Sequence, residues 1–469
     1  MSTPVVVIGG SLAGLAAAAR LAKLGHRVEL FEQTDRLGGR WAPTTLATGT
    51  LVDDAPAVLG FPAPWRDLFR KSGRPLEAEL ARLGYALVPA GPAMVVFADG
   101  SELTWPADRS GQFSALTTAY GPTVAAGWQD LLDRLDQVWQ TLRPLGWEAE
   151  LRDRAQLTFG VRRRLLGRQS LARLASSLPH PHLEALVRSV GYRQGSVPER
   201  TPAWAAVELS LHRTFGRWQL QALDPAAAGG VGRSSVLVEA LAARLRLRQV
   251  TVHTECAVTA VRVVDGRVAA VSTATGDHPA AAVVSALDPW QTYCVLLPPG
   301  AAQRTRRRVN SLHPAHAPTI GHELRDSATG SDVREVTTLT AAGVPLVDYI
   351  RPIPGGTVTS RHDFRDTTPR PSAGVAWDGL RSWTRRPPVS SEVAGLFTAG
   401  PFSPAGPGHQ LGGPGRLGEP GVHQVHVRLL DRQLAFDSAR GLHVCQEMCS
   451  SSNGHERMSI RTVTAPGVT

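Results

Sequence analysis

A β-α-β nucleotide-binding pattern at the start of the chain constrains its fold more than any other feature. Residues 4–8 form a continuous β-branched run, which is typical of a strand buried on both faces of a parallel sheet. A glycine-rich turn over residues 9–14 follows, and residues 15–24 favour a helix that Gly25 ends. A second strand over residues 27–31 completes the pattern. This order predicts a Rossmann-like domain.

The turn has the residue types that a bound dinucleotide requires. Gly9 permits the tight turn, and Gly14 lets the helix pack closely on the strand. Ser11 replaces the usual middle glycine, yet it is small enough for the backbone to approach a pyrophosphate, and its hydroxyl can donate to phosphate. Leu12 and Ala13 begin the helix, where free N–H groups and the positive dipole end favour phosphate.

An acid and a second glycine loop favour a flavin over a nicotinamide. Glu32 ends the second strand, where a carboxylate can accept the ribose hydroxyls and would repel the 2′-phosphate of NADP. Gly38 and Gly39 let the backbone pass close to a second part of the ligand, and Arg40 can reach a phosphate. A nicotinamide dehydrogenase does not need this loop, so we expect FAD as the cofactor.

The positive charge of the chain does not indicate nucleic-acid binding. The formal net charge is +10, and only Lys23 and Lys71 are lysines among the 50 basic residues. Arginines are spread along the chain, and the clusters at 162–164 and 304–308 lie in no nucleic-acid motif. We expect solvated helix faces, with a peripheral contact to anionic lipid head groups left open. The apolar residues between 161 and 178 do not share one helical face, so this segment is a poor amphipathic anchor.

The cysteines and the apolar runs favour the cytoplasm. Cys256, Cys294, Cys445 and Cys449 have no CxxC spacing, so a disulfide framework is not expected. Cys445 and Cys449 with His443 are a weak metal alternative, and we expect no metal site. The sequence shows no signal peptide and no apolar run of the ~18 residues that a transmembrane helix needs.

These motifs resemble the phytoene desaturase (carotenoid desaturase) family, within the flavin amine-oxidase-like superfamily. The superfamily motif is Glu32-x3-Arg36-x-Gly38-Gly39-Arg40. Ala55 and Pro56 lie in a segment that resembles the flavin-contacting loop, with alanine where glycine is usual. Further stretches that resemble the family are residues 65–74, 96–101, 229–232 and 282–289, and the resemblance spans about residues 4–408.

The resemblance implies an α/β fold with a Rossmann-like FAD-binding domain and an inserted α+β substrate domain. The FAD-binding domain would be discontinuous, over residues 1–75, 225–290 and 385–408. The substrate domain would take residues 76–224 and 291–384, and residues 409–469 would be an atypical, disordered tail. Within the superfamily, a residue matching Val258 touches the adenine through its backbone.

Local patterns add detail to this architecture. Asp99-Gly100 and Asp265-Gly266 predict hairpin turns, the second between residues 258–264 and 268–272. Apolar residues recur with helical spacing over residues 128–142, and Pro144 is expected to end that helix. The tryptophans are expected in the core, although such residues can also line an apolar tunnel.

The expected chemistry is hydride transfer between an apolar substrate and flavin N5, as the resemblance implies for an isoprenoid or polyene. The cofactor carries that chemistry, so no catalytic triad is expected, and the catalytic residues are not identified. His180, His182, His313 and His316 are acid/base candidates that we interpret as exposed loop residues. Many amine-oxidising relatives hold a water with a lysine on a later strand, whereas both lysines here precede residue 72.

The end of the chain departs from the family pattern. Residues 395–400 match the strand before the last flavin contact, where Gly400 is followed by Pro401 instead of the usual acid. Residues 412–421 should begin a helix, yet seven of the ten are Gly or Pro. Either flavin binds more weakly without this helix, or the chain is translated out of frame there. The missing acid and helix favour the alternative of an inactive flavin-binding remnant. A flavin hydroxylase is the other alternative, since the Gly9–Gly14 turn sequence is also common among such enzymes. The sequence does not indicate the oligomeric state.

Overall fold

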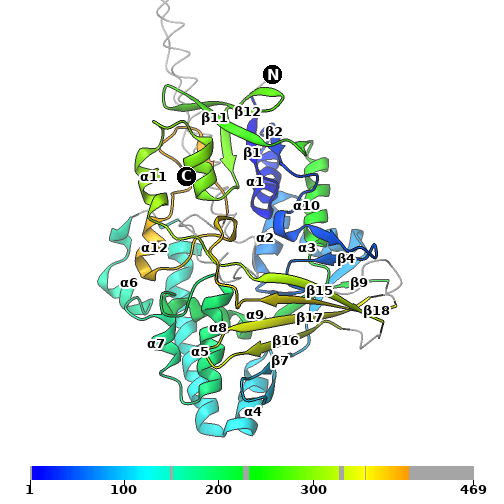
Figure 1. Cartoon of the computed structure of the whole chain (residues 1–469), viewed down its shortest axis with the longest axis vertical. Coiled ribbons are helices and arrows are strands. Elements are labelled where there is room, and N and C mark those ends of the chain that lie inside the picture. The colour runs from blue at the N-terminus through cyan, green and yellow to red at the C-terminus, as the bar shows by residue number, and fades with distance from the viewer. Residues whose placement is uncertain are drawn as a thin grey trace, which may run out of the picture.

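The computed structural model describes residues 3–147, 150–151, 153–224, 232–326, 332–353 and 355–400 (Figure 1). The helices are α1 (Leu12–Lys23), α2 (Ala63–Ser72), α3 (Leu76–Arg82), α4 (Arg109–Tyr120), α5 (Pro122–Leu142), α6 (Phe159–Arg164), α7 (Leu171–Ala175), α8 (Pro181–Arg193), α9 (Val207–Phe215), α10 (Val236–Leu247), α11 (Gln303–Asn310) and α12 (Gly379–Arg385).

The strands are β1 (Val5–Ile8), β2 (Val28–Phe31), β3 (Pro43–Thr45), β4 (Leu51–Asp53), β5 (Val58–Gly60), β6 (Tyr85–Pro89), β7 (Ala93–Val96), β8 (Glu102–Trp105), β9 (Arg217–Ala222), β10 (Thr251–His253), β11 (Val258–Val264), β12 (Arg267–Thr273), β13 (Gly276–Pro279), β14 (Ala282–Ser285), β15 (Thr319–Arg325), β16 (Arg334–Leu339), β17 (Pro345–Ile353), β18 (Gly356–Asp363) and β19 (Leu396–Thr398).

A five-stranded parallel sheet forms the upper part of the molecule as drawn in Figure 1. Its order is β10-β2-β1-β14-β19, and β1 lies between β2 and β14 with all four of its residues buried. Helix α1 connects β1 to β2 and contacts α10 and α2. The apolar runs are buried because helices cover a parallel sheet on its faces. This arrangement confirms the predicted α/β fold class and the β-α-β unit.

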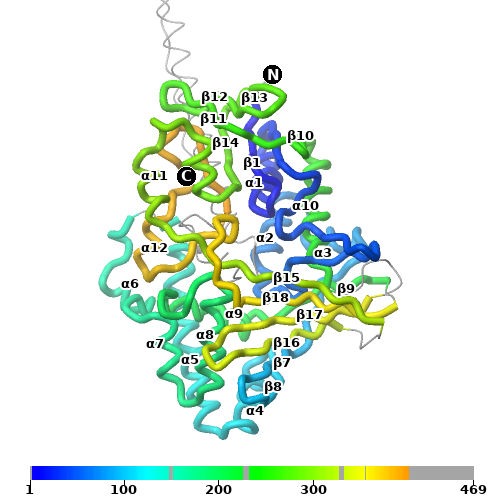
Figure 2. Tube along the Cα trace, in the orientation of Figure 1, coloured from blue at the N-terminus to red at the C-terminus, as the bar shows by residue number. Residues whose placement is uncertain are grey.

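A second, mixed sheet lies below the first, beside the helices α4 to α9 (Figure 2). Its order is β15-β18-β17-β16-β7-β8, in which β16 runs parallel to β7 and the other neighbours are antiparallel. A third, small antiparallel sheet has the order β5-β9-β6. The strands of the parallel sheet come from three distant stretches of sequence, and the predicted domain boundaries stay a prediction.

The local predictions are confirmed with small shifts. The hairpin of β11 and β12 turns at Asp265 and Gly266, whose φ angles of 48° and 74° suit a primed turn. Helix α5 starts at Pro122, six residues before the predicted range, because Pro suits the first helical position. It ends at Leu142, and a π-helical turn continues through Pro144.

The apolar residues of α5 and most of the described tryptophans are core residues, whereas Trp105, Trp218 and Trp290 are half-buried. The seven apolar α5 residues at the predicted spacing are at most 6 % exposed. Trp204, Trp377 and Trp383 pack together in the same core cluster, at most 1 % exposed. Within the described ranges, no helix is both long and apolar enough to cross a membrane.

Candidate functional site

In the glycine-rich turn, the start of α1 lies so close to the end of β1 that only glycine fits at position 14. Gly9 has a φ of 96°. A Cβ on Gly14 would lie 1.9 Å from the Gly9 carbonyl oxygen, closer than any side chain tolerates. The first turn of α1 is therefore held directly against the end of β1, at the carboxyl edge of the sheet where α/β proteins bind ligands.

The N-terminus of α1 has the donors of an anion site. Ser11 is the N-cap residue, but its side chain makes no capping bond, and the first turn contains no acid. The N–H groups of Leu12, Ala13 and Gly14 have no acceptor within the helix, as for any helix start. Leu12 and Ala13 are buried, while Ser11 is half-buried. These donors and the helix dipole suit a pyrophosphate.

Glu32 lies at the end of β2, beside this turn. Its Oε2 accepts from the Gly10 N–H at 2.7 Å, and its Oε1 accepts from the Thr34 N–H at 2.9 Å and from the Thr34 hydroxyl at 2.8 Å. These bonds hold the carboxylate toward the turn and leave lone pairs for further donors. The Cys256 N–H donates to the Glu32 carbonyl, so half-buried Val258 follows directly beside the site.

The second glycine loop also reaches the turn. The Gly38 N–H donates to the Gly10 carbonyl at 2.7 Å, and Gly38 and Gly39 have φ angles of 112° and 56°. Arg40 donates to the Ser372 carbonyl at 2.6 Å and is half-buried. Burial lowers the pKa of Arg40 to about 10, so it stays cationic at neutral pH. Among the described residues no carboxylate pairs with Arg40, which leaves its charge available to an anion.

The segment before β5 is tied to the start of α10. Ala55 and Pro56 are buried, and the Pro56 carbonyl accepts from the Ser234 hydroxyl at 2.5 Å. Asp53 accepts from the Ser235 N–H at 3.0 Å. Sequence reasoning missed Asp53, Ser234 and Ser235, because the two partners are 182 positions apart in the chain. The available signal was that Asp53 and Asp54 directly precede Ala55 and Pro56 in the segment that resembles the flavin-contacting loop, but the sequence does not show which residue Asp53 contacts.

A further predicted cofactor residue, Gly400, lies at the far edge of the sheet. Gly400 is buried with a φ of 130°, and it follows β19, which pairs in parallel with β14. The strand predicted over residues 395–400 is therefore present. Pro401, the glycines at 229 and 230, and the tail after residue 408 lie outside the described residues.

Two further histidines lie near the Asp53–Pro56 segment and were also missed. His322 on β15 is hydrogen-bonded to Asp54 at 2.9 Å and to Ser360 at 3.0 Å. His362 on β18 is 1 % exposed, and neither ring nitrogen has a partner among the described residues. Burial lowers the pKa of His362 to about 4, so it is neutral at physiological pH.

The four histidines named as acid/base candidates have mostly structural roles. His180 caps α8, and His182 in α8 stacks on Phe97 at 3.9 Å. Both are half-buried, as is His316, so the interpretation as exposed loop residues is correct only for His313. The structure corrects the other three, because Tyr120 of α4 stacks on His180, Phe97 stacks on His182, and His316 forms a β-bridge with Pro369.

The residues at this edge fit a flavin adenine dinucleotide. The close approach at Gly14, the unpartnered helix N–H groups and the cationic Arg40 suit its phosphates. The Glu32 carboxylate lies beside the same turn and has lone pairs that could accept ribose hydroxyls. Among the described residues, no group of three His, Cys, Asp or Glu could hold a metal, and Cys256 and Cys294 are free thiols.

Comparison with protein families identifies a flavin family. The family model described as flavin containing amine oxidoreductase matches residues 12–320. Phytoene dehydrogenase from Streptomyces griseus is 35% identical over 136 residues, which are 29% of this chain and 26% of that protein. A 4,4'-diapophytoene desaturase from Staphylococcus aureus is 39% identical over 83 residues, 17% of this chain and 16% of that protein. The chain thus matches only about a quarter or less of the length of these curated relatives.

Solved structures share the fold over nearly the whole chain. Putrescine oxidase superposes with a TM-score of 0.63 at 14% identity, covering 93% of this chain and 99% of that one. Cyclohexylamine oxidase from Brevibacterium oxydans gives a TM-score of 0.59 at 16% identity, covering 92% and 100%. At these identities the similarity shows the fold alone.

Proposed function

This chain belongs to the flavin containing amine oxidoreductase family and is an FAD-dependent oxidoreductase, and from that premise we propose that it desaturates or saturates an apolar substrate. The substrate class we propose is an isoprenoid or another polyene. The partial relatives named phytoene dehydrogenase and diapophytoene desaturase support this class.

The proposal assigns a part to each predicted cofactor residue. The turn from Gly9 to Gly14 and Arg40 would hold the pyrophosphate, Glu32 the ribose and Val258 the adenine. Ala55, Pro56, Gly400 and Pro401 would face the flavin ring, beside the Gly38-Gly39 loop. When bound, FAD supplies N5 as the hydride acceptor or donor. The chain supplies orientation and a dry environment.

The distribution of lysine is the observation that carries the choice of substrate. The whole chain has two lysines, Lys23 and Lys71. Lys71 is paired with Asp67 on α2, and Lys23 is exposed at the end of α1. No lysine is therefore available on a later strand to hold a water beside the flavin, as many amine-oxidising relatives do.

The test is an anaerobic reduction experiment on the purified full chain. We expect flavin absorbance near ~450 nm, a property of the cofactor, to bleach with an apolar polyene such as phytoene and to stay unchanged with putrescine. Bleaching by putrescine alone would contradict the proposed substrate class. A colourless protein that takes up no added FAD would instead support the inactive-remnant alternative.

A further inference from the structure

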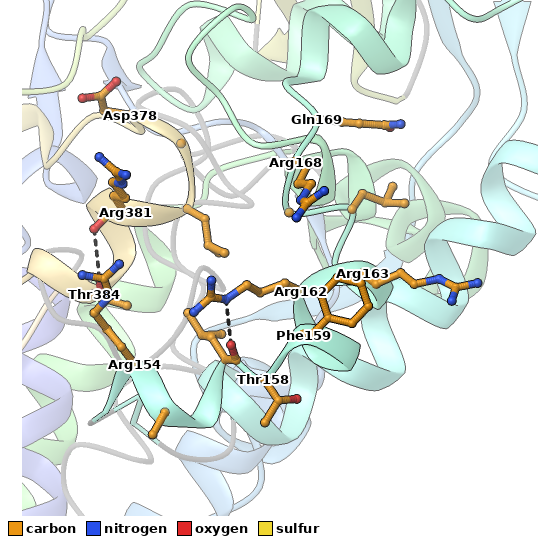
Figure 3. Close-up of a pocket in the computed structure, with 16 residues that line it drawn as sticks. Arg154, Thr158, Phe159, Arg162, Arg163, Arg168, Gln169, Asp378, Arg381 and Thr384 are labelled. Carbon is orange, nitrogen blue, oxygen red and sulfur yellow. Dashed lines mark hydrogen bonds between the residues drawn. The ribbon is translucent and has the colours of Figure 1, made fainter.

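A large cavity lies between α6 and α12, on the helical side of the molecule. Its volume is about 1140 Å³, which exceeds the size of most small-ligand pockets. Its walls come from a 3-10 turn (Arg154–Gln156), from α6 and the segment after it, and from α12 (Figure 3). We call it the arginine cleft.

The lining of the arginine cleft is strongly basic. Among the described residues that line it, the charged ones are Arg154, Arg162, Arg163, Arg168 and Arg381, with Asp378 as the single acid. A second hollow of about 450 Å³ shares Arg154, Arg381 and Thr384 with it and adds Arg308 and Arg385. Seven arginines and one acid thus surround two adjoining hollows.

None of the seven arginines forms an ion pair among the described residues; other exposed arginines such as Arg134 and Arg334 also lack one, but neither of these lines either hollow. Elsewhere on the surface, Arg109 pairs with Asp133 at 2.7 Å and Arg361 with Asp348 at 2.8 Å. Arg162 instead donates from Nε to the Leu157 carbonyl at 2.7 Å, which holds its side chain across the cleft. Like charges that gather without counter-charges repel, so an anion would stabilise this arrangement.

Apolar side chains share the same walls. They are Leu157, Phe159, Leu166 and Leu380. Phe159 is 73% exposed, although aromatic side chains usually contribute to a core or an interface. The leucines at 165, 171 and 174 of this segment are buried in the core, whereas Phe159 is exposed. Figure 3 shows Arg162 extending from α6 toward α12, whereas Arg163 points away.

We propose that the arginine cleft binds a phosphate-bearing amphiphile. The phosphate would be held by Arg162, Arg168 and Arg381, because planar guanidinium groups match phosphate oxygens in bidentate geometry. The alkyl part would lie along Phe159 and Leu380. An inorganic anion alone would leave the apolar wall and most of the volume unused. This site goes beyond the proposed redox function, since it involves none of the residues assigned to FAD.

Isothermal titration of the full chain with monododecyl phosphate, kept below its micelle concentration, tests the proposal. We expect saturable binding, at least tenfold tighter than inorganic phosphate or uncharged dodecyl maltoside. Arg162→Gln with Arg381→Gln should weaken binding at least tenfold. Arg164→Gln should change it less than twofold, since Arg164 is on the same helix but outside the cleft lining. An equal loss in both variants overturns the assignment, and circular dichroism checks that each is folded.

A sedimentation assay with vesicles identifies the source of the phosphate. One outcome is that the protein binds phosphatidylglycerol vesicles but not phosphatidylcholine vesicles, and loses this binding in the variant Arg162→Gln with Arg381→Gln. That outcome means that the cleft takes a lipid head group. Binding of monododecyl phosphate without vesicle binding means that it takes a free amphiphile. Binding to neither probe overturns the proposal.

Discussion

At the residue scale, the close contact between α1 and β1 in the nucleotide turn depends on the absence of a Cβ atom at Gly14. Alanine is about 1 kcal/mol better than glycine inside a helix, so Gly14 costs α1 stability. The 1.9 Å approach to the Gly9 carbonyl explains why glycine is needed at this position. Glu32 acts on the same turn by accepting from Gly10.

Gly14→Ala is expected to lower stability by about 1–3 kcal/mol, as for overpacking of a core, and to abolish flavin retention. The reason is that the added methyl group pushes α1 away from β1. Urea unfolding and the flavin-to-protein absorbance ratio measure both effects. Gly160→Ala is the matched control, because a Cβ there meets nothing within 4 Å in helix α6. A Gly14→Ala variant that retains flavin would contradict the steric argument.

Glu32→Gln is expected to weaken FAD binding about tenfold, since charge-assisted hydrogen bonds are roughly twice as strong as neutral ones. Flavin fluorescence quenching measures the dissociation constant. Glu29→Gln, three residues earlier on β2 and paired with Arg27 at 3.0 Å, should leave it unchanged. An equal loss of FAD affinity in both variants would mean that the substitutions perturb β2 and would not support a ribose contact by Glu32.

At the element scale, buried polar contacts join strands from different sheets. Arg217 on β9 and Glu335 on β16 form an ion pair at 2.5 Å, with side chains 5% and 4% exposed. Arg217 also donates to the Gly91 carbonyl at 3.2 Å. The pair therefore connects the small sheet to the mixed sheet. Removal of either partner leaves the other charged group buried without its ion pair.

Glu335→Gln is expected to destabilise the protein by about 3–5 kcal/mol, because Arg217 then stays charged without its partner. The double variant Arg217→Met with Glu335→Leu should recover most of this loss, since no buried charge remains. Chemical denaturation of the three proteins measures the difference. A double variant as unstable as Glu335→Gln would show that the charges themselves stabilise the fold.

His362 on β18 predicts a pH dependence of stability. Its pKa is about 4 in the folded protein and about 6.5 in an unfolded chain. The unfolded state therefore binds a proton first, so stability is full above about pH 6.5, falls as pH drops toward 4, and then levels off. The slope is up to about 1.4 kcal/mol per pH unit. His362→Gln should show a shallower decline between pH 6.5 and 4, and an unchanged decline would exclude His362 as its source.

At the scale of the whole molecule, the site depends on segments that are far apart in the chain. The parallel sheet joins strands that begin at residues 5, 28, 251, 282 and 396. The described residues that we propose to bind FAD come from several of these segments, so a bound ligand would contact them together. Binding should therefore stabilise the molecule as a unit.

FAD at about 100 times its dissociation constant is expected to stabilise the protein by about 2.7 kcal/mol. At ~2.1 cal/mol/K of unfolding entropy per residue, a chain of 469 residues gains roughly 1 °C per kcal/mol, so the melting temperature should rise by about 3 °C. FMN, which lacks the adenosine that Glu32 would hold, should give a smaller shift. Equal shifts with FAD and FMN would argue against an adenosine site at Glu32.

Much of the fold and part of the site could be predicted from local patterns. The turn at residues 9–14, the primed hairpin at Asp265 and the apolar spacing of α5 depend on neighbours within a few positions. The pairs Asp53–Ser235 and Arg217–Glu335 could not be predicted, because their partners are 182 and 118 positions apart. The histidines of α8 were misread for the same reason.

The sequence by itself determined the β-α-β unit, its glycine positions and the preference for FAD, because turn geometry and strand and helix periodicity depend on adjacent residues. Only the tertiary structure decided which polar groups meet. It buried His362, placed Asp54 against His322 and gathered arginines from residues 154, 162, 168 and 381 around one cleft. Such sites depend on the path of the whole chain, which local patterns do not encode.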